Sequence, residues 1–325
     1  IARAYGNNAS VLNATLTIIT SNATLVNDDY TWWINCSDGL NTNIGEIRNI
    51  SINLYTICEL NTYYIDFEGG SDSNNGICSN SAWKHDPGDS NAGGVADFTN
   101  LSAGDTVIFK GGIKYIGQIN ILKNGSVGSY ITYDGNSAGT WGVGKAIIDG
   151  ENTTYYGFYG SAKKYIKIKN FEIRNISYNS ADSNAMCGIA GINSLFWNIT
   201  NNFIHDVGYW KNDGVHDPGG HGILLTLPND MLISNNTITK TGKTGISSDG
   251  MVNSTISKNE IYSYIQWLID ISGYYRAPNN VTISENIIHD FYQYDCKTNT
   301  LDTLEGIFWN GSSCTSPDNP HTDGI

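Results

Sequence analysis

Apolar and polar residues alternate along the first 60 positions. The alternation runs through three segments, VLNATLTIIT, YTWWINCS and EIRNISINLYTI, and turn-forming clusters such as DGLNTNIG separate them. A period of two is typical of β-strands with one buried face, so we predict short antiparallel strands here. Beyond Tyr63 the pattern changes to short apolar runs between Gly, Asp and Asn clusters, as in GDTVIFKGGIKYIGQINI.

An irregular internal repeat follows in the second half of the chain. Five hexads recur at spacings of 31, 34, 23 and 27 residues, namely IKNFEI, ITNNFI, ISNNTI, ISKNEI and ISENII. A second apolar motif follows each hexad, at CGIAGI, HGILLT, TGISSD, WLIDIS and EGIFWN. Each repeat therefore predicts a rung of at least two short strands, joined by loops of variable length.

Stacking of such rungs explains the repeat, because one rung cannot bury its Ile side chains by itself. The hexads predict a continuous Ile column made of Ile204, Ile238, Ile261 and Ile288. One hexad position also repeats as Asn. Asn tolerates the left-handed backbone of a tight turn, and stacked Asn side chains can hydrogen-bond from rung to rung. The predicted Asn column is Asn202, Asn236, Asn259 and Asn286.

The start of the second region resembles a known family. The segment YYIDFEGGSDSNNGICSNSAWKHD, followed by LSAGDTVIFKGG, resembles the opening of a right-handed parallel β-helix of the pectate-lyase type, as found in secreted polysaccharide lyases. The stretch YTWWINCSDGLNTNIGEIRNISI resembles the last hairpin of immunoglobulin-like surface modules. Such a sandwich needs about seven strands, and the first region has room for four or five.

We therefore predict an all-β chain with two domains. Residues 1–60 form an immunoglobulin-like β-sandwich without its first strands, and residues 61–325 form a right-handed parallel β-helix. An unrelated set of sandwich strands is the alternative, which the five coincident hexads disfavour.

The net charge and the composition disfavour several classes of binding partner and of protein. The net charge of −13 disfavours nucleic acid and anionic lipid as partners. No apolar run approaches the roughly 18 residues of a membrane span. With 15% charged and 40% hydrophobic residues, the chain is unlike a charge-rich disordered protein.

N-glycosylation sequons are abundant. We count fourteen among 40 Asn residues, where composition alone would give roughly 7. The excess favours an extracellular, N-glycosylated protein, with compositional accident as the alternative. Three of these Asn residues sit at odd offsets before a hexad Ile and should form a strip facing away from the core, at Asn198, Asn253 and Asn280. The others are Asn8, Asn13, Asn22, Asn35, Asn49, Asn100, Asn124, Asn152, Asn175, Asn235 and Asn310.

Six cysteines are compatible with an oxidising compartment. A hairpin turn near residues 41–43 would place Cys36 opposite residue 47, too far from Cys58 for a bridge. We predict disulfides Cys58–Cys78 at the domain junction and Cys296–Cys314 in the last loop. Cys36 and Cys187 are left over, either as thiols or as links to another chain.

Loop lengths predict a cleft. The second and fifth rungs have long loops, 205–221 and 289–305, and the rungs between them have short ones. Aromatic and charged residues there suit sugar rings, and the His and Asp residues could alternatively bind a metal or merely cap turns. The candidates are His205, Asp206, His216, Asp217 and His221 on one wall, His289 and Asp290 on the other, and Tyr262, Tyr264 and Trp267 with Lys240 on the floor.

The resemblance to lyases implies calcium held by clustered carboxylates and a Lys or Arg base. The outward column after each second-motif Ile reads Ala190, Leu224, Ser247, Asp270 and Phe308. It holds one carboxylate with no partner above or below, and Asp249 is shifted along its strand. We predict no metal or cofactor other than calcium, and that only if the protein is an enzyme using Lys243, Asp249 and Asp270.

Our leading functional hypothesis is therefore a non-catalytic extracellular structural protein, a filament or sheath subunit. Copies of the chain would join head to tail through the open ends of both domains. The alternative is a secreted polysaccharide lyase-like enzyme, or a carbohydrate-binding adhesin, acting on an acidic glycan.

Overall fold

The computed structural model describes residues 28–33, 35–37, 40–52, 58–178, 186–208, 219–264, 267–290, 293–295 and 300–302. The chain divides into two compact units, Ile1–Ile57 and Cys58–Ile325. Among the described residues, no helix is long and apolar enough to cross a membrane.

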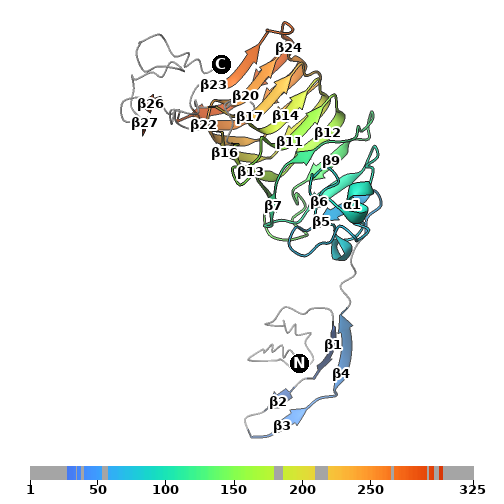
Figure 1. Cartoon of the computed structure of the whole chain (residues 1–325). Coiled ribbons are helices and arrows are strands. Elements are labelled where there is room, and N and C mark those ends of the chain that lie inside the picture. Colours follow the sequence, from blue (N-terminus) through green and yellow to red (C-terminus); the bar gives the residue numbers. More distant parts are fainter. Residues whose placement is uncertain are drawn as a thin grey trace. The chain divides into compact units, whose positions relative to one another are not determined.

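The described part of the first unit is a hairpin of four short strands (Figure 1). Strand β1 (Asp28–Trp32) pairs antiparallel with β4 (Arg48–Ile52), and β2 (Asn35–Ser37) pairs with β3 (Thr42–Ile44). Cys36 pairs with Asn43 and not with residue 47, because the chain reverses between Ser37 and Thr42, earlier than predicted. The hairpin itself is confirmed. An immunoglobulin-like sandwich is not shown, and its other predicted strands fall in residues 1–27, outside the described residues.

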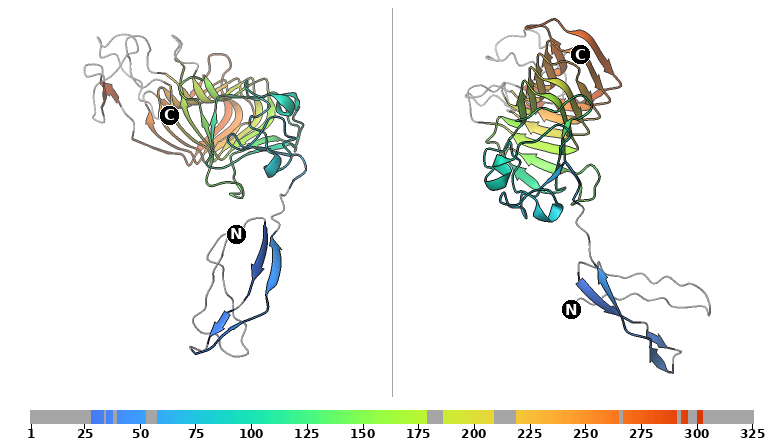
Figure 2. Two further views of the ribbon diagram at one scale, coloured as in Figure 1. Left: turned by 60° about the horizontal axis from the view of Figure 1, so that its bottom comes forward. Right: turned by 90° about the vertical axis from the view of Figure 1, so that its right-hand side faces the viewer.

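The second unit is a right-handed parallel β-helix of three stacked sheets (Figures 1 and 2). Sheet 1 contains β5 (Thr62–Ile65), β6 (Thr106–Phe109), β9 (Ile131–Asp134), β12 (Lys164–Lys169), β15 (Leu195–Thr200), β18 (Leu232–Ser234), β21 (Val252–Ser257) and β24 (Asn279–Ser284). Sheet 2 contains β7 (Lys114–Ile116), β10 (Ala146–Asp149), β13 (Phe171–Ile176), β16 (Phe203–Val207), β19 (Thr237–Thr241), β22 (Glu260–Tyr264) and β25 (Ile287–His289). Sheet 3 contains β8 (Ile119–Asn120), β11 (Tyr156–Ser161), β14 (Cys187–Ile192), β17 (His221–Thr226), β20 (Thr244–Asp249) and β23 (Trp267–Ser272).

Each rung passes through sheets 1, 2 and 3 in that order, so neighbouring rungs meet as parallel strands throughout. Two short helices, η1 (Ser79–Ser81) and α1 (Gly94–Phe98), lie in the long segment between β5 and β6. A small antiparallel pair, β26 (Gln293–Asp295) with β27 (Thr300–Asp302), follows the last described rung.

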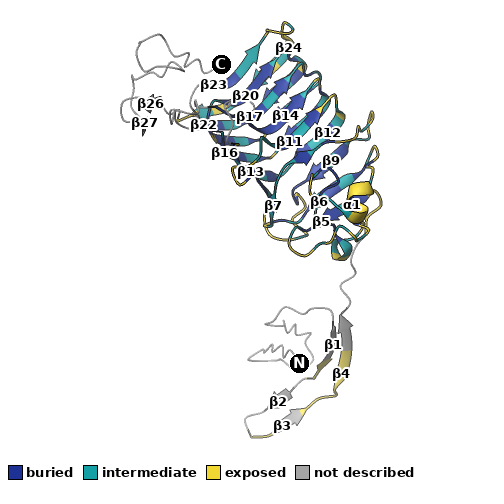
Figure 3. Ribbon diagram, viewed as in Figure 1, coloured by how far each residue is buried: buried dark blue, intermediate teal, exposed yellow. Residues whose placement is uncertain are grey.

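The core lies between the three sheets, whose inward faces are buried (Figure 3). The predicted Ile column is confirmed, because Ile204, Ile238, Ile261 and Ile288 stand in register on β16, β19, β22 and β25. Ile173 on β13 extends the column by one rung. All but the last of these residues are fully buried, and Ile288 is half-buried.

The predicted Asn column is also confirmed and forms a hydrogen-bonded ladder between sheets 1 and 2. In each step, the Oδ1 atom of one Asn accepts the backbone N–H and the Nδ2–H of the Asn one rung before it, at 2.9–3.1 Å. The left-handed residue, however, is the one before each ladder Asn. These residues have φ between 55° and 58°, and they are Asn201, Asn235, Lys258 and Glu285.

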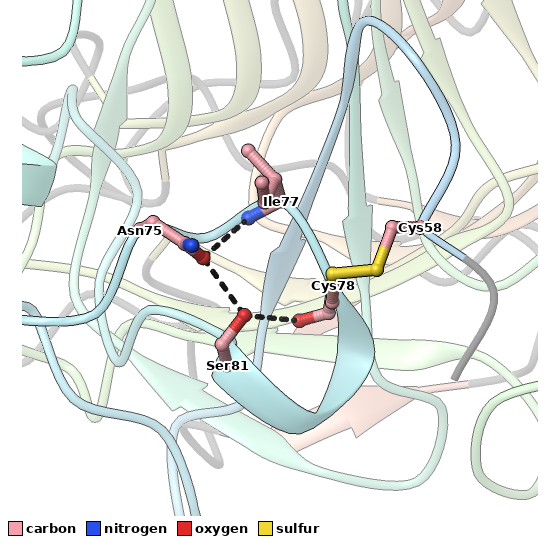
Figure 4. Close-up of a disulfide and its surroundings, with 5 residues drawn as sticks. All are labelled: Cys58, Asn75, Ile77, Cys78 and Ser81. Atoms are coloured by element: carbon pink, nitrogen blue, oxygen red, sulfur yellow. Dashed lines mark hydrogen bonds between the residues drawn. A yellow bond between two sulfur atoms is a disulfide. The ribbon is translucent and has the colours of Figure 1, made fainter. Parts of the chain in front are cut away.

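The disulfide Cys58–Cys78 is present, as predicted (Figure 4). It ties the first residue of the second unit to the loop that precedes η1. Next to it, the side-chain Oδ1 of Asn75 accepts the N–H of Ile77 at 3.2 Å and the hydroxyl of Ser81 at 2.8 Å. Cys187 is a buried thiol. The predicted Cys296–Cys314 bridge lies outside the described residues.

Candidate functional site

The outer face of sheet 3 carries a straight column of side chains, one on each rung. Register places Tyr159, Ala190, Leu224, Ser247 and Asp270 opposite one another on consecutive strands. This is the column expected from the second motifs, apart from Phe308, which lies outside the described residues. Successive side chains alternate between the two faces of a strand, so the column points away from the buried Ile residues.

Asp270 is the only carboxylate in this described column, and its surroundings favour the protonated form. Its Oδ2 accepts the Ser247 hydroxyl at 3.3 Å. Partial burial raises the pKa of Asp270, while the Ser247 hydrogen bond and the nearby Lys243 ammonium act in the opposite direction and Asp249 raises it again. The net shift is upward, because removal from water outweighs the two stabilising contacts.

Asp249 lies diagonally across from Asp270 on the adjacent strand. It follows Ser247 by two residues, so it shares the outer face of sheet 3. With strands about 4.8 Å apart and a rise of about 3.3 Å per residue, the two side chains leave the sheet about 8 Å apart. The Tyr275 N–H donates to Asp249 Oδ1 at 3.1 Å and Oδ2 at 3.3 Å. In the described part of sheet 3, Asp270 therefore has no carboxylate directly opposite it but does have a diagonal one.

Two exposed tyrosines lie next to Asp249, to which the Tyr275 N–H donates. Tyr274 and Tyr275 are 85% and 65% exposed, and their rings meet edge to face at 4.9 Å. Arg276 fixes their loop, since its guanidinium donates to the Gly250 carbonyl at 2.8 Å and the Pro228 carbonyl at 2.7 Å. Our reading of the sequence missed both tyrosines. The only signal was an aromatic pair between Gly and Arg after a strand motif, outside any repeat position.

His221 is not a cleft wall, contrary to the prediction. It begins β17 in register with Cys187 and Thr244, and its side chain is buried with no hydrogen-bond partner at Nδ1. Burial, and secondarily the nearby Lys243, lowers the pKa of His221 to about 3. Burial likewise raises the pKa of the Cys187 thiol. Both groups are therefore neutral near pH 7.

His205 and Asp206 lie on sheet 2, within an ion network on its outer face. His205 Nδ1 is 2.6 Å from Asp206 Oδ2, and its Nε2 is 3.3 Å from Glu172 Oε1. Arg174 donates to Glu172 at 2.7 Å and to Asp149 at 2.9 Å. Lys240 Nζ lies 3.9 Å from Asp206. His216 and Asp217 lie outside the described residues.

Tyr262 belongs to a second copy of this arrangement, three rungs later. Its ring stacks on His289 at 4.9 Å with an interplanar angle of 8°. His289 contacts Asp290 at 2.8 Å and Glu260 at 3.3 Å, and these bonds, Asp290 first, raise the pKa of His289. Tyr264 ends β22 and Trp267 begins β23, with side chains outside the described part. Among the described residues, floor and wall candidates therefore meet on sheet 2, where Tyr262 stacks on His289 and Lys240 lies near Asp206, whereas His221 is buried on sheet 3.

The sequence predicted glycan sites, and a metal site was one alternative interpretation of its His and Asp residues. In the described part of the chain, no group of three or more His, Cys, Asp or Glu residues could hold a metal ion. Asn198, Asn253 and Asn280 all lie on sheet 1. Asn280 Nδ2 donates to Asn253 Oδ1 at 3.0 Å on the outer surface. Their glycosylation stays a prediction, as does head-to-tail assembly, whose chain ends fall in residues 1–27 and 303–325, outside the described residues.

No family model and no curated protein matches this chain. Among solved structures, it is similar to a GH136 lacto-N-biosidase from Eubacterium ramulus, with 13% identity, a TM-score of 0.44 and coverage of 70% of this chain and 56% of that one. It is also similar to an alginate lyase from Paenibacillus sp. str. FPU-7, with 15% identity, a TM-score of 0.38 and coverage of 62% of this chain and 73% of that one. For the pectate lyase Pel9A, the identity is 15%, the TM-score is 0.36, and the match covers 69% of each chain.

This chain therefore spans little more than half the length of the lacto-N-biosidase. Likenesses at these TM-scores carry no argument about activity.

Proposed function

We propose that this protein is an extracellular enzyme that hydrolyses a glycan on the outer face of sheet 3. The observation that carries the proposal is the pair of carboxylates on adjacent strands, Asp249 on β20 and Asp270 on β23, in two different environments. Most glycoside hydrolases use two such groups, one protonated and one ionised. A carboxyl group whose pKa is raised, as that of Asp270 is, is suited to act as the acid of such a pair.

Asp270 is the general acid in this proposal. Its raised pKa keeps a larger share of the carboxyl protonated, so that it can donate a proton to the glycosidic oxygen as the bond breaks. Asp249 is the general base. The Tyr275 N–H stabilises its carboxylate, which takes a proton from the water that attacks the anomeric carbon. The products are two shorter glycans, one with a new reducing end.

The spacing between Asp249 and Asp270 predicts the anomeric configuration of the product. The two side chains leave the same face of the sheet about 8 Å apart. If they extend in parallel, their carboxyl groups keep about that separation, which lies within the roughly 6.5–9.5 Å between the carboxyl groups of inverting enzymes. Retaining enzymes hold their carboxyl groups at about 5–5.5 Å. We therefore expect inversion at the anomeric carbon.

In this proposal the substrate contacts Tyr274 and Tyr275, which lie next to Asp249. The exposed rings of Tyr274 and Tyr275 offer apolar faces to a sugar ring, and aromatic surface next to a few fixed polar groups is typical of small-molecule sites. Lys243, close enough to Asp270 to affect its pKa, supplies a cation that favours an acidic sugar. The disulfide Cys58–Cys78 supports an extracellular setting.

The experiment measures release of reducing ends from a panel of neutral and uronate-containing polysaccharides. We expect cleavage by the wild-type chain, with the rate reduced at least 100-fold by Asp270→Asn and by Asp249→Asn. The control is Asp97→Asn, since Asp97 is an exposed carboxylate on α1, and it should leave the rate unchanged. NMR of the first product formed should show the inverted anomer.

Three other outcomes would overturn the proposal. Unsaturated uronate products, lost in Lys243→Ala, would indicate an eliminating lyase with Lys243 as its base. Binding of a glycan without any cleavage, weakened by Tyr274→Ala but unaffected by Asp270→Asn, would indicate a carbohydrate-binding adhesin. Retention of full hydrolytic activity in both Asp variants would place the chemistry elsewhere.

A further inference from the structure

Three aromatic rings form a stack where β9, β12 and β15 of sheet 1 begin, whereas the carboxylate pair lies on sheet 3. The Tyr165 and Phe196 rings lie face to face, with centroids 4.5 Å apart and an interplanar angle of 4°. The Tyr130 ring meets Tyr165 edge to face at 5.7 Å, and the Lys167 ammonium lies over Tyr130 at 4.8 Å. All three rings are half-buried. We call Tyr130, Tyr165 and Phe196 the aromatic stack.

The backbone at this position does not explain the rings. Tyr165 and Phe196 have left-handed φ angles of 57° and 58°, which are unfavourable for bulky residues. The strand register places Asp230, Asn253 and Asn280 at the same position on the next three rungs, and their backbone is left-handed too. Asn and Asp tolerate this conformation best. Rings here are therefore locally unfavourable, and such outliers favour a functional interpretation.

The aromatic stack ends at Phe196. One face of the Phe196 ring packs on Tyr165, but the corresponding residue on the next rung is Asp230, whose side chain is short and polar. Among the described residues, no second ring packs against Phe196 from that side. An aromatic face beside a carboxylate suits a sugar ring, which has apolar C–H faces and a rim of hydroxyl groups.

A glycosylation sequon lies next to this end of the stack. Phe196, Asn198 and Thr200 alternate on β15 with Trp197 and Ile199, which are fully buried. The first three side chains therefore share the outer face, and Asn198 leaves it about 7 Å from Phe196. Asn198, Ile199 and Thr200 together make an acceptor sequence for N-glycosylation. A sugar attached to Asn198 is thus within reach of the Phe196 ring.

The other two sequons on the strands of this sheet lack a ring two positions earlier. The residues there are Met251, which is buried, and Pro278. Asn253 and Asn280 stand in the column of Phe196 instead of beside it, and Asn280 Nδ2 donates to Asn253 Oδ1 at 3.0 Å. These two sites therefore serve as matched controls on the same face.

We propose that Asn198 carries an N-linked glycan whose first sugar packs on the Phe196 end of the aromatic stack. The donor is a lipid-phosphate-linked oligosaccharide. A C–N bond forms between the anomeric carbon of the first sugar and Asn198 Nδ2, the bond from that carbon to the phosphate oxygen breaks, the lipid phosphate leaves, and the amide loses one proton.

The attached sugar stabilises the folded chain. Its apolar face covers the Phe196 ring, and the Asp230 carboxylate accepts a hydrogen bond from one of its hydroxyl groups. The proposal shares the extracellular setting of the proposed function but none of its chemistry, so either can fail without the other.

The test uses the full chain secreted from a eukaryotic host, whose N-glycans begin with N-acetylglucosamine, and the same chain made without glycosylation. Peptide mass spectrometry should find Asn198 modified. The glycosylated chain should have a Tm a few degrees above that of the unglycosylated one. Asn198→Gln should remove most of this difference, and Asn253→Gln should leave it unchanged. Trimming the glycans to their first sugar with an endoglycosidase should also preserve it, because the first sugar makes the contact.

Two variants, Phe196→Ala and Phe196→Leu, test the ring itself. In each, the unglycosylated variant is the reference, so the lost packing on Tyr165 cancels, and the Tm difference due to glycosylation should fall by at least half. Leu keeps more of the side-chain volume, so this variant covers the case in which Phe196→Ala fails to fold. An unmodified Asn198 would overturn the proposal. So would a Tm difference that is unchanged in the Phe196 variants, or one that is lost in Asn253→Gln instead of Asn198→Gln.

Discussion

Removing the side-chain amide of a ladder Asn should destabilise the β-helix far more than removing the side-chain amide of the residue before it. Asn236 is 1% exposed, and its side chain takes part in four hydrogen bonds. It donates to the Ile199 carbonyl and to Asn259 Oδ1, and it accepts both N–H groups of Asn202. At about 1 kcal/mol net for each bond, Asn236→Ala should lower the free energy of unfolding by about 4 kcal/mol.

The matched control is Asn235→Gly, one residue earlier. Asn235 is exposed, has φ of 55° and makes one long side-chain contact, to Ser234 at 3.4 Å. Glycine adopts this backbone freely, so the change should cost less than about 1 kcal/mol. Urea unfolding of protein made without N-glycosylation measures both values, because Asn235 begins a sequon. A loss for Asn236→Ala below about 1 kcal/mol, at an unchanged m-value, would refute a stabilising ladder.

Three further predictions concern other parts of the molecule. Because the raised pKa of Asp270 keeps the acid protonated, kcat should fall as pH rises through that pKa. Lys243 lowers the pKa of Asp270, so Lys243→Ala should move the decrease of kcat at high pH to still higher pH. A pH–rate profile that does not move in this variant would contradict Asp270 as the acid. Reduction of the Cys58–Cys78 bridge, which closes 20 residues, should cost about 3 kcal/mol in urea unfolding, and no loss would show that the bridge does not constrain the unfolded chain. Mass spectrometry of native protein should find N-glycans on the three sequons of sheet 1, at Asn198, Asn253 and Asn280. Unmodified Asn residues at these sites would contradict the prediction that this face carries glycans.

The repeated parts of the fold were predictable because stacking demands the same residue at the same place. An Ile such as Ile238 ends every hexad, and an Asn such as Asn236 stands at the fourth position of four of the five, so their neighbours above and below followed from spacing alone. The left-handed residue before each ladder Asn was not predictable in this way, because Lys258 and Glu285 occupy it as well as Asn. Its conformation is imposed by the corner between sheets 1 and 2 and not by local preference.

The candidate site was only partly predictable. The second motifs placed Asp270 on an outward column, but recognising Asp249 as its partner required the diagonal geometry between strands. Loop lengths gave a cleft that mixed residues of different sheets. His205 lies in the middle of β16 of sheet 2, whereas His221 begins β17 of sheet 3, and a rung turns a corner between the two. Tyr274 lies outside the repeat, so no periodic signal could mark it.

The Asn ladder also limits how this chain can change in length during evolution or design. Every ladder Asn presents the same donors to one side and the same acceptor to the other, so any two of them are interchangeable partners. Excising the 23 residues from Asn236 to Lys258 would place Asn259 directly after Asn235 and opposite Asn202, with every ladder bond restored. Inserting a few residues inside a strand would instead displace Ile238 from its column. The β-helix can therefore grow or shrink in whole rungs, in steps of about 4.8 Å. This excision would remove Asp249 with β20, so moving the carboxylate pair along the axis would require a rung to be added or removed before β20.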